Sequence, residues 1–395
     1  MKALCAAFVF SLASIWSGTA FAAELRAAVL RIDYQKLAPI SRFEKSPTDL
    51  AFAGAALATQ DNQTTGQFLG HKFELKTVST TPEKAKDALG SLRADGINVI
   101  VVSANADDLL AIADAATDAL VLNAGAPDIR LRDVDCRSNV LHITPSNGMR
   151  ADAVAQFSAY KRWSRWLLVH GSNSADKRLA DAYRKAALKF GQKIVEEREI
   201  LDTGGSRRSD TGHVAVQRQI PVLVQEAKEH DLVIAADASD VFAPYLPFHL
   251  WDPRPVMGSA GLRPVSFNPA SESWGGTQFQ SRFEKLAGRY VTEADYDAWL
   301  ALRAVGEAVT RTGSDDPTVL RDYMLGDKFE LAAFKGQPLT FRSWNGQMRQ
   351  PILLYDGRIT ATVSPQEGFL HQFSPLDTLG LDAPESKCTA FKGGN

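Results

Sequence analysis

Residues 97–102 read INVIVV, and this stretch decides the fold class. Most of its side chains are apolar and β-branched, which favours an extended strand. An apolar run that does not alternate with polar residues is typical of a parallel strand covered by helices on both faces. A helix is predicted at 106–117, directly after the next turn. The stretch therefore predicts an α/β fold built on a parallel sheet.

The same alternation of strand and helix extends in both directions from this stretch. It occurs once before about residue 145 and once after it, which predicts two doubly wound α/β lobes with right-handed crossovers. The other predicted strands cover residues 25–32, 73–79, 119–122, 140–143, 165–169, 193–200 and 232–236. The other predicted helices cover 47–62, 81–93, 149–162, 177–190 and 222–230, the first of them capped by Ser46 with Pro47 in its first turn.

The last third of the chain departs from this alternation. Successive helices are predicted at 278–290 and 294–310, a shorter one starts at Asp316, and strands follow at 339–341 and 351–355. Four aromatic residues occur in a segment without regular assignment: Phe242, Tyr245, Phe248 and Trp251. They form either a wall of a cleft or a satellite core.

Two lobes that exchange segments are joined by a hinge and face each other across a cleft. We expect a first lobe from 23–145 and 260–336, a second lobe from 146–259 and 337–362, and a C-terminal tail at 363–395.

Residues 1–22 have the pattern of a secretory signal peptide. Lys2 supplies a positive charge, residues 3–16 are apolar and uncharged, and Ala20-Phe21-Ala22 offers an A-x-A cleavage site. The apolar part is shorter than the roughly 20 residues that span a bilayer. We therefore expect export to the periplasm, removal of the signal, and a mature chain without stable membrane insertion.

Composition excludes several other classes of protein. The chain has 395 residues, of which 45% are hydrophobic and 23% charged, as in ordinary globular proteins of two domains. Its 44 Lys and Arg residues nearly balance its 46 Asp and Glu residues, for a net charge of −2. This balance gives no general attraction to nucleic acid. We also expect the protein to be a monomer.

Two cysteines remain once the signal peptide, with Cys5, is removed. Cys136 and Cys388 in an oxidising compartment are most simply a disulfide, which would join the tail to a loop 252 positions earlier. Two separately buried thiols are the alternative, because sequence spacing does not show proximity.

The motifs of several catalytic and nucleotide-binding classes are missing from the sequence. It contains no G-x-G-x-x-G after a strand, no P-loop, no H-E-x-x-H and no G-x-S-x-G. We therefore predict that the protein is not an enzyme and has no cofactor, metal site or catalytic residue.

Turns that follow the predicted strands are the expected ligand site. In open α/β sheets, ligands bind beyond the carboxyl ends of the strands, so two facing lobes would grip a small molecule between these turns. The candidate ligand-binding residues are Asp33, Tyr34, Ser103, Ala104, Asn105, Asn123, Gly125, His170, Ser172, Asp237 and Ser239. Alternatively, each of these residues only forms its turn or caps the next helix.

These features resemble the type I periplasmic binding proteins of the branched-chain amino-acid group. The resemblance rests on an exported two-lobed α/β chain, on Tyr296-Asp297-Ala298 within a helix, and on Leu339-Thr340-Phe341. The loop around Cys136 and residues 336–351 look more specifically like the substrate-binding proteins of pyrroloquinoline-quinone-dependent alcohol dehydrogenase systems. In the turns where relatives bind an amino acid, only Ser103 is a clear match, and Asp33-Tyr34-Gln35-Lys36 replaces a glycine-rich turn.

The resemblance implies a receptor that closes on a small polar solute and presents it to an ABC transporter permease. A second hypothesis is a periplasmic accessory protein that delivers or senses a cofactor or metal for alcohol oxidation, which would require carboxylates clustered in the cleft. A third is an exported hydrolase, which would require a Ser or His triad there.

Overall fold

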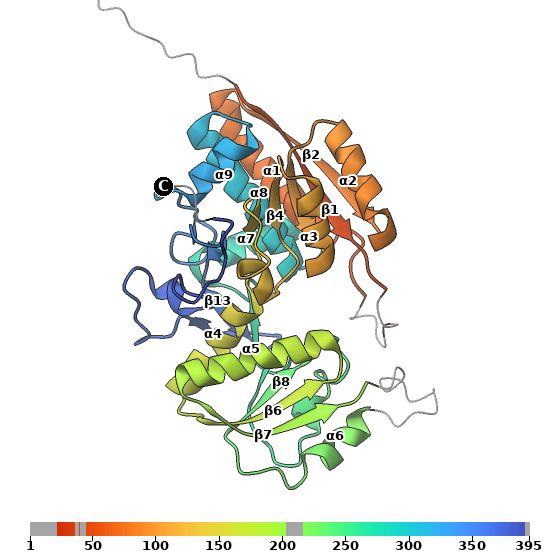
Figure 1. Ribbon diagram of the computed structural model, residues 1–395, viewed down its shortest axis with the longest axis vertical. Coiled ribbons are helices and arrows are strands. Elements are labelled where there is room, and N and C mark those ends of the chain that lie inside the picture. The colour runs from red at the N-terminus through yellow and green to blue at the C-terminus, as the bar shows by residue number, and fades with distance from the viewer. Residues whose placement is uncertain (1–21, 36–38, 40–44, 203–215, 392–395) are drawn as a thin grey trace, which may run out of the picture.

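The computed structural model of the protein describes residues 22–35, 39, 45–202 and 216–391. It contains two α/β lobes, each built on a parallel sheet, which confirms the predicted fold class (Figure 1). Residues 1–21 of the predicted signal peptide lie outside the described residues. No helix in the described ranges is long and apolar enough to cross a membrane.

The first lobe has a five-stranded parallel sheet in the order β2-β1-β3-β4-β5. Its strands are β1 (Glu24–Ile32), β2 (Lys72–Thr80), β3 (Val99–Ser103), β4 (Leu120–Asn123) and β5 (Val140–His142). Helices α2 (Ala85–Ala94) and α3 (Ala106–Ala115) cover one face, where Leu89, Leu109 and Ile112 pack against Ile100 and Val121. The last four residues of the INVIVV stretch, Val99–Val102, are buried between the two helical layers.

The other face of this sheet packs against helices from both ends of the chain. These helices are α1 (Phe52–Gly66), α7 (Gly276–Ala287), α8 (Glu293–Thr312) and α9 (Pro317–Leu325) (Figure 1). The two short strands β11 (Thr340–Phe341) and β12 (Met348–Arg349) form a hairpin, and Phe341 and Met348 pack into the same core. The division of the chain between the lobes at the expected boundaries stays a prediction.

The second lobe has a four-stranded parallel sheet in the order β7-β6-β8-β9. Its strands are β6 (Arg165–Gly171), β7 (Lys193–Ile200), β8 (Leu232–Ala236) and β9 (Val256–Gly258). Helices α4 (Asn147–Tyr160) and α5 (Ser174–Phe190) cover one face, and α6 (Val216–Val224) lies on the other. An antiparallel sheet, β10 (Arg263–Val265), β13 (Ile352–Tyr355) and β14 (Thr360–Ser364), packs beside α4.

Two helix predictions are wrong, each for an identifiable reason. The first helix starts at Phe52 and not at Pro47, because Ala51 has a φ of 67° and its N–H donates to the carboxylate of Asp295 at 2.9 Å. The helix predicted at 222–230 is α6, which ends at Val224. Its buried residues Val216, Ile220 and Val224 recur every four positions, and the prediction missed this stripe.

The aromatic segment 242–251 divides between core and surface. Phe242 is fully buried in the core of the second lobe, and Tyr245 packs against that core. Phe248 and Trp251 are exposed. The first two residues therefore belong to the main core of the second lobe, and they form neither a wall of the cleft cavity nor a separate satellite core.

The tail is fixed to both lobes. Cys136 and Cys388 form a disulfide with a Cα–Cα distance of 5.7 Å, which confirms the predicted pair. On the side of the second lobe, the N–H of Gly380 donates to Asp152 at 2.7 Å and its carbonyl accepts from Lys189 at 2.9 Å. The tail therefore bridges the lobes near their junction.

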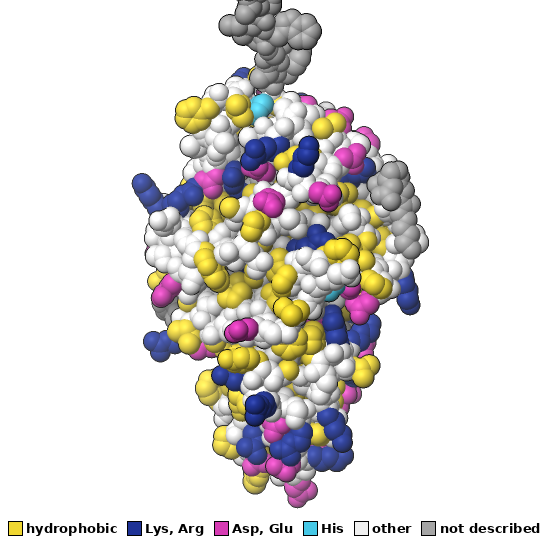
Figure 2. Space-filling model, turned by 90° about the vertical axis from the view of Figure 1, so that its left-hand side faces the viewer, with side chains coloured by type: hydrophobic (Ala, Val, Ile, Leu, Met, Phe, Trp, Pro, Cys, Tyr) yellow, Lys and Arg dark blue, Asp and Glu magenta, His cyan; other side chains and the backbone are white. Residues whose placement is uncertain are grey.

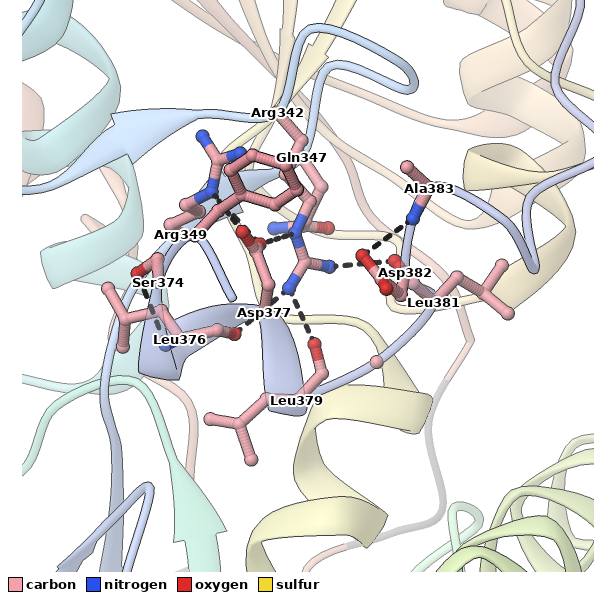
Figure 3. A network of polar contacts seen from close by, with 12 residues as sticks. Arg342, Gln347, Arg349, Ser374, Leu376, Asp377, Leu379, Leu381, Asp382 and Ala383 are labelled. Atoms are coloured by element: carbon pink, nitrogen blue, oxygen red, sulfur yellow. Dashed lines mark hydrogen bonds and ion pairs between the residues drawn. The ribbon is translucent and has the colours of Figure 1, made fainter. Parts of the chain in front are cut away.

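A buried ion pair anchors this tail (Figure 3). Arg342 and Asp377 are each 1% exposed and pair at 2.8 Å, and Arg349 joins the same carboxylate at 2.9 Å. The Arg342 guanidinium also donates to the carbonyls of Leu376, Leu379 and Leu381 at 3.0, 2.7 and 3.2 Å. Because Arg342 and Asp377 are both withdrawn from water, removing the carboxylate leaves the buried guanidinium uncompensated.

We predict that Asp377→Asn lowers the free energy of unfolding by about 3–5 kcal/mol. The matched control is Asp322→Asn, which breaks the exposed pair with Arg321 and should cost less than about 1 kcal/mol. Urea denaturation of both variants measures the difference. Equal, small effects would show that the buried pair does not anchor the tail.

Candidate functional site

A cavity of about 430 Å³ lies between the two lobes. Its walls include the turns after β1, β3 and β4 of the first lobe, and the start of α5 and the turn after β8 of the second. This volume falls within the range of small-molecule sites in proteins. The carboxyl ends of both sheets thus border one cleft, which is where ligands bind in open α/β sheets.

Six of the eleven candidate ligand-binding residues line this cavity. They are Asp33, Tyr34, Ser103, Ala104, Asn105 and Gly125, all from the first lobe. The other five are not part of its lining: Asn123, His170, Ser172, Asp237 and Ser239. In the second lobe the cavity is lined instead by Asn147, Ala175, Arg178 and Ala238.

Tyr34 is held in place by the start of α3. Its hydroxyl donates to the Asp108 carboxylate at 2.5 Å and accepts the N–H of Asn105 at 2.9 Å. Burial, followed by the hydrogen bond to Asp108, raises the pKa of the Tyr34 hydroxyl well above its usual value. Asn105 also caps α3 by accepting the N–H of Asp108 at 2.9 Å. The phenol is therefore a neutral, fixed part of the cavity wall.

Asp33 is bound by its neighbours at the rim of the cavity. Its carboxylate pairs with Arg31 at 2.8 Å and also contacts the hydroxyl of Ser79. Arg31 donates in addition to the carbonyls of Thr48 and Leu50 at 3.0 and 2.8 Å, so it ties the segment before α1 to the edge of the sheet.

Asn123 shapes the cavity without facing it. Its side-chain oxygen accepts the N–H groups of Gly125 and Ala126 at 3.1 and 2.8 Å, and its amide nitrogen donates to the carbonyl of Ala126 at 2.8 Å. This brings Gly125 so near the neighbouring turn that an added Cβ would lie 2.6 Å from the nitrogen of Ala104. The two turns therefore form a continuous wall made largely of backbone.

His170 and Ser172 serve the interior of the second lobe. His170 is buried, with its ring nitrogens 2.8 Å from the carbonyl of Gly171 and 3.0 Å from the Glu197 carboxylate. The hydroxyl of Ser172 accepts the N–H of Asp202 at 3.0 Å. Ser172 directly follows β6 as predicted, whereas His170 lies within the strand, and the polar atoms of both residues hold neighbouring segments together.

Asp237 and Ser239 position the turn that carries Ala238. The Asp237 carboxylate accepts three backbone N–H groups, from Val241, Phe242 and Ala243, at 3.0, 2.7 and 2.7 Å. Ser239 donates its hydroxyl at 3.0 Å to Asp176, a fully buried carboxylate that also accepts the N–H of Ala238. Burial raises the pKa of Asp237 despite these bonds. Asp237 and Ser239 therefore support the cavity without lining it.

One ion pair crosses the cleft, and sequence reasoning missed it. Arg178 on α5 lies 3.2 Å from Asp128 in the loop after β4. Arg31, Asn147 and Ala175 were also missed among the lining residues. Ala175 and Arg178 lie in the first turns of α5, directly after the turn that follows β6. The sequence prediction started this helix at 177, and a correct helix start was the signal that could have identified both residues.

Buried polar contacts join the crossovers between the lobes. Asp297 of the Tyr296-Asp297-Ala298 motif accepts the hydroxyl of Ser266 at 2.6 Å. Lys335 donates to the carbonyls of Ser266 and Pro351, the latter at 2.9 Å. Burial lowers the pKa of Lys335 to about 7, and burial together with Glu293 raises that of Asp297. The motif therefore contributes to the hinge and not to the cavity.

Comparisons with known proteins agree with this geometry. A family profile described as "Periplasmic binding protein" matches residues 46–206. A branched-chain amino acid ABC transporter periplasmic ligand-binding protein from Burkholderia xenovorans superposes with a TM-score of 0.70 at 17% identity, over 93% of this chain and 100% of that one. No curated protein matches the sequence.

Two further solved structures have the same architecture. A leucine-, isoleucine-, valine-, threonine- and alanine-binding protein from Brucella ovis, in a closed conformation, gives a TM-score of 0.67 at 16% identity over 84% of this chain and 89% of that one. An ABC transporter solute-binding protein from R. palustris in complex with benzoate gives 0.63 at 12% identity over 92% and 99%. The fold of this chain is that of the type I periplasmic binding proteins.

We predict that Gly125→Ala lowers the free energy of unfolding by about 1–3 kcal/mol, because the new methyl group overlaps backbone atoms of Ala104. The matched control is Gly90→Ala in α2, where no atom lies within 4 Å of the added Cβ. That variant should gain up to about 1 kcal/mol from helix propensity. Urea denaturation compares them, and a neutral Gly125→Ala would contradict the close contact of the two turns.

The lowered pKa of Lys335 predicts that the stability of the folded protein depends on pH. Because the pKa of Lys335 is about 7 in the folded protein and about 10.4 in an unfolded chain, the unfolded state binds more protons between these values. The wild type should therefore gain stability relative to Lys335→Met as pH rises from about 7 to 10, by at most about 1.4 kcal/mol per pH unit. Denaturation curves across this range measure the slope, and parallel profiles would show that Lys335 titrates normally.

Proposed function

We propose that the protein is a periplasmic solute receptor that closes on a small polar molecule and presents it to the membrane permease of an ABC transporter. The observation that carries this proposal is a ligand-sized cavity whose walls come from both lobes, with Asp128 and Arg178 paired across it. A molecule that contacts both lobes favours the arrangement in which they lie together.

The comparisons support this function by analogy. The structural neighbours include ligand-binding and solute-binding proteins of ABC transporters, a protein that binds leucine, isoleucine, valine, threonine and alanine, and a complex with benzoate. Transfer of that role to this chain, together with export, the periplasmic location and a monomeric state, belongs to the proposal.

Charge in the cavity favours a solute without a large net charge. Arg31 is paired with Asp33, and Arg178 with Asp128, so each described guanidinium in the lining already has a carboxylate partner. The remaining polar groups include the hydroxyls of Ser103 and Tyr34 and the amide of Asn147. These neutral donors and acceptors suit a small polar solute better than a metal ion, and this favours the receptor over a metal-delivering accessory protein.

The link to pyrroloquinoline-quinone-dependent alcohol oxidation rests on the resemblance of the Cys136 loop and residues 336–351 alone. A role as an accessory of such a system stays the alternative. A hydrolytic role is disfavoured by the position of His170, which lies in the second lobe between Gly171 and Glu197 and outside the cavity lining.

Calorimetry and small-angle scattering test the proposal with L-leucine, L-threonine, glycerol, benzoate and Ca²⁺ as probes. We expect a neutral or zwitterionic probe to bind and to reduce the radius of gyration. Ser103→Val in the first lobe should weaken that binding by about tenfold, because it removes a hydroxyl from the wall. Ala175→Leu in the second lobe should weaken it at least as much by filling the cavity.

The matched control is Ala94→Leu, an exposed position of α2 outside the cavity lining, which should leave affinity unchanged. Binding of Ca²⁺ alone would favour the accessory protein instead. A receptor that closes on its ligand would be contradicted if only one of the variants Ser103→Val and Ala175→Leu lost affinity. It would also be contradicted if a probe bound without reducing the radius of gyration.

A further inference from the structure

We propose that the junction of the two lobes with the C-terminal tail forms a second binding site, separate from the cleft, for a small apolar molecule without charge. A cavity of about 380 Å³ lies there. Its apolar lining comes from Ile129 of the first lobe, from Ala182 and Leu188 of α5, and from Leu381 of the tail. This inference does not depend on the proposed function of the cleft.

The second cavity lies along the same helix as the cleft, but among the described residues none lines both cavities. Ala175 and Arg178, near the start of α5, line the cleft, whereas Ala182 and Lys185, one and two turns further on, line the second cavity. Arg178 and Asp128, which form the ion pair across the cleft, both line the cleft and are not part of the lining of the second cavity. One face of α5 therefore serves two separate compartments.

The tail wall of this cavity is preformed. Arg342 holds the carbonyls of Leu379 and Leu381 from one side, as Figure 3 shows. Lys189 and Asp152 hold both backbone polar groups of Gly380 from the side of the second lobe. A wall pinned from both sides needs little reorganisation when a molecule binds.

Apart from Lys185, the polar side chains that line the cavity are already engaged, which leaves mainly apolar surface for a ligand. Asp152 pairs with Lys189 at 2.9 Å, the Ser146 hydroxyl accepts the N–H of Met149, and the Glu385 carboxylate accepts the N–H of Asp382 at 2.9 Å. Lys185 and Glu385 carry opposite charges at the rim, so neither sign of ligand charge is favoured.

The size and surroundings of the cavity agree with a small apolar ligand. The cavity is more than twice the roughly 150 Å³ that admits benzene in an apolar interior. Figure 2 shows apolar side chains gathered around the middle of the face on which the tail lies, while many Lys and Arg side chains lie toward the lower end of the second lobe. Leu188 of the lining is itself 85% exposed, so this side of the cavity borders solvent.

Cyclohexanecarboxamide is a suitable uncharged probe, and ligand-observed NMR and calorimetry measure its binding to the full chain. We expect millimolar or tighter affinity. Gly148→Leu should weaken it at least tenfold, because its Cβ would lie at ordinary contact distances of 3.5 Å from Ile129 and 3.6 Å from Gly380 and the rest of the side chain enters the cavity. Gly90→Leu, in open space on α2, is the matched control and should leave affinity unchanged.

Two comparisons distinguish this site from the cleft and test its preference for an uncharged ligand. Ala175→Leu, which fills the cleft, should leave binding of the carboxamide at the second site intact, so failure of the receptor proposal and failure of this one give different results. Cyclohexanecarboxylate and cyclohexylmethylamine should bind several-fold more weakly. No carboxamide binding, full binding by Gly148→Leu, or tighter binding of either charged analogue would overturn the proposal.

Discussion

The direction of the strands is the constraint on which the rest of this structure depends. All strands of each main sheet run parallel, so the turns at their carboxyl ends collect along one edge. Because the two sheets present these edges to each other, residues from β1, β3 and β4 meet residues from α5 and the β8 turn around one cavity. The contact between the Gly125 and Ala104 turns then makes that wall largely from backbone.

The tail and the crossovers add a second constraint, because they connect the lobes at a common junction. The disulfide ties residue 388 to the first lobe, and Asp152 and Lys189 tie Gly380 to the second. Lys335 and Asp297 link the crossover segments through Ser266. In the proposed receptor, these contacts would form the junction about which the lobes rotate when the cleft opens or closes.

Sequence patterns predicted the strands well, because an uninterrupted apolar run such as Val99–Val102 encodes burial on both faces locally. They misplaced the start of α1, because the conformation of Ala51 is fixed by Asp295, 244 positions away. They also placed the turns of the second lobe correctly but not the direction of their side chains. His170 and Asp237 bond to partners inside that lobe, whereas Arg178 reaches Asp128 across the cleft, and such long-range pairing leaves no local pattern.

Closure of the lobes around a solute is the central claim, and a distance between spin labels measures it most directly. Lys86 on α2 and Val222 on α6 are exposed positions in different lobes, and both native cysteines that the structure describes are in the disulfide. Labels at these sites, read by pulsed electron resonance, should show a shift toward shorter distances when the calorimetrically identified probe is added. An identical distance distribution with and without a bound probe would contradict the account.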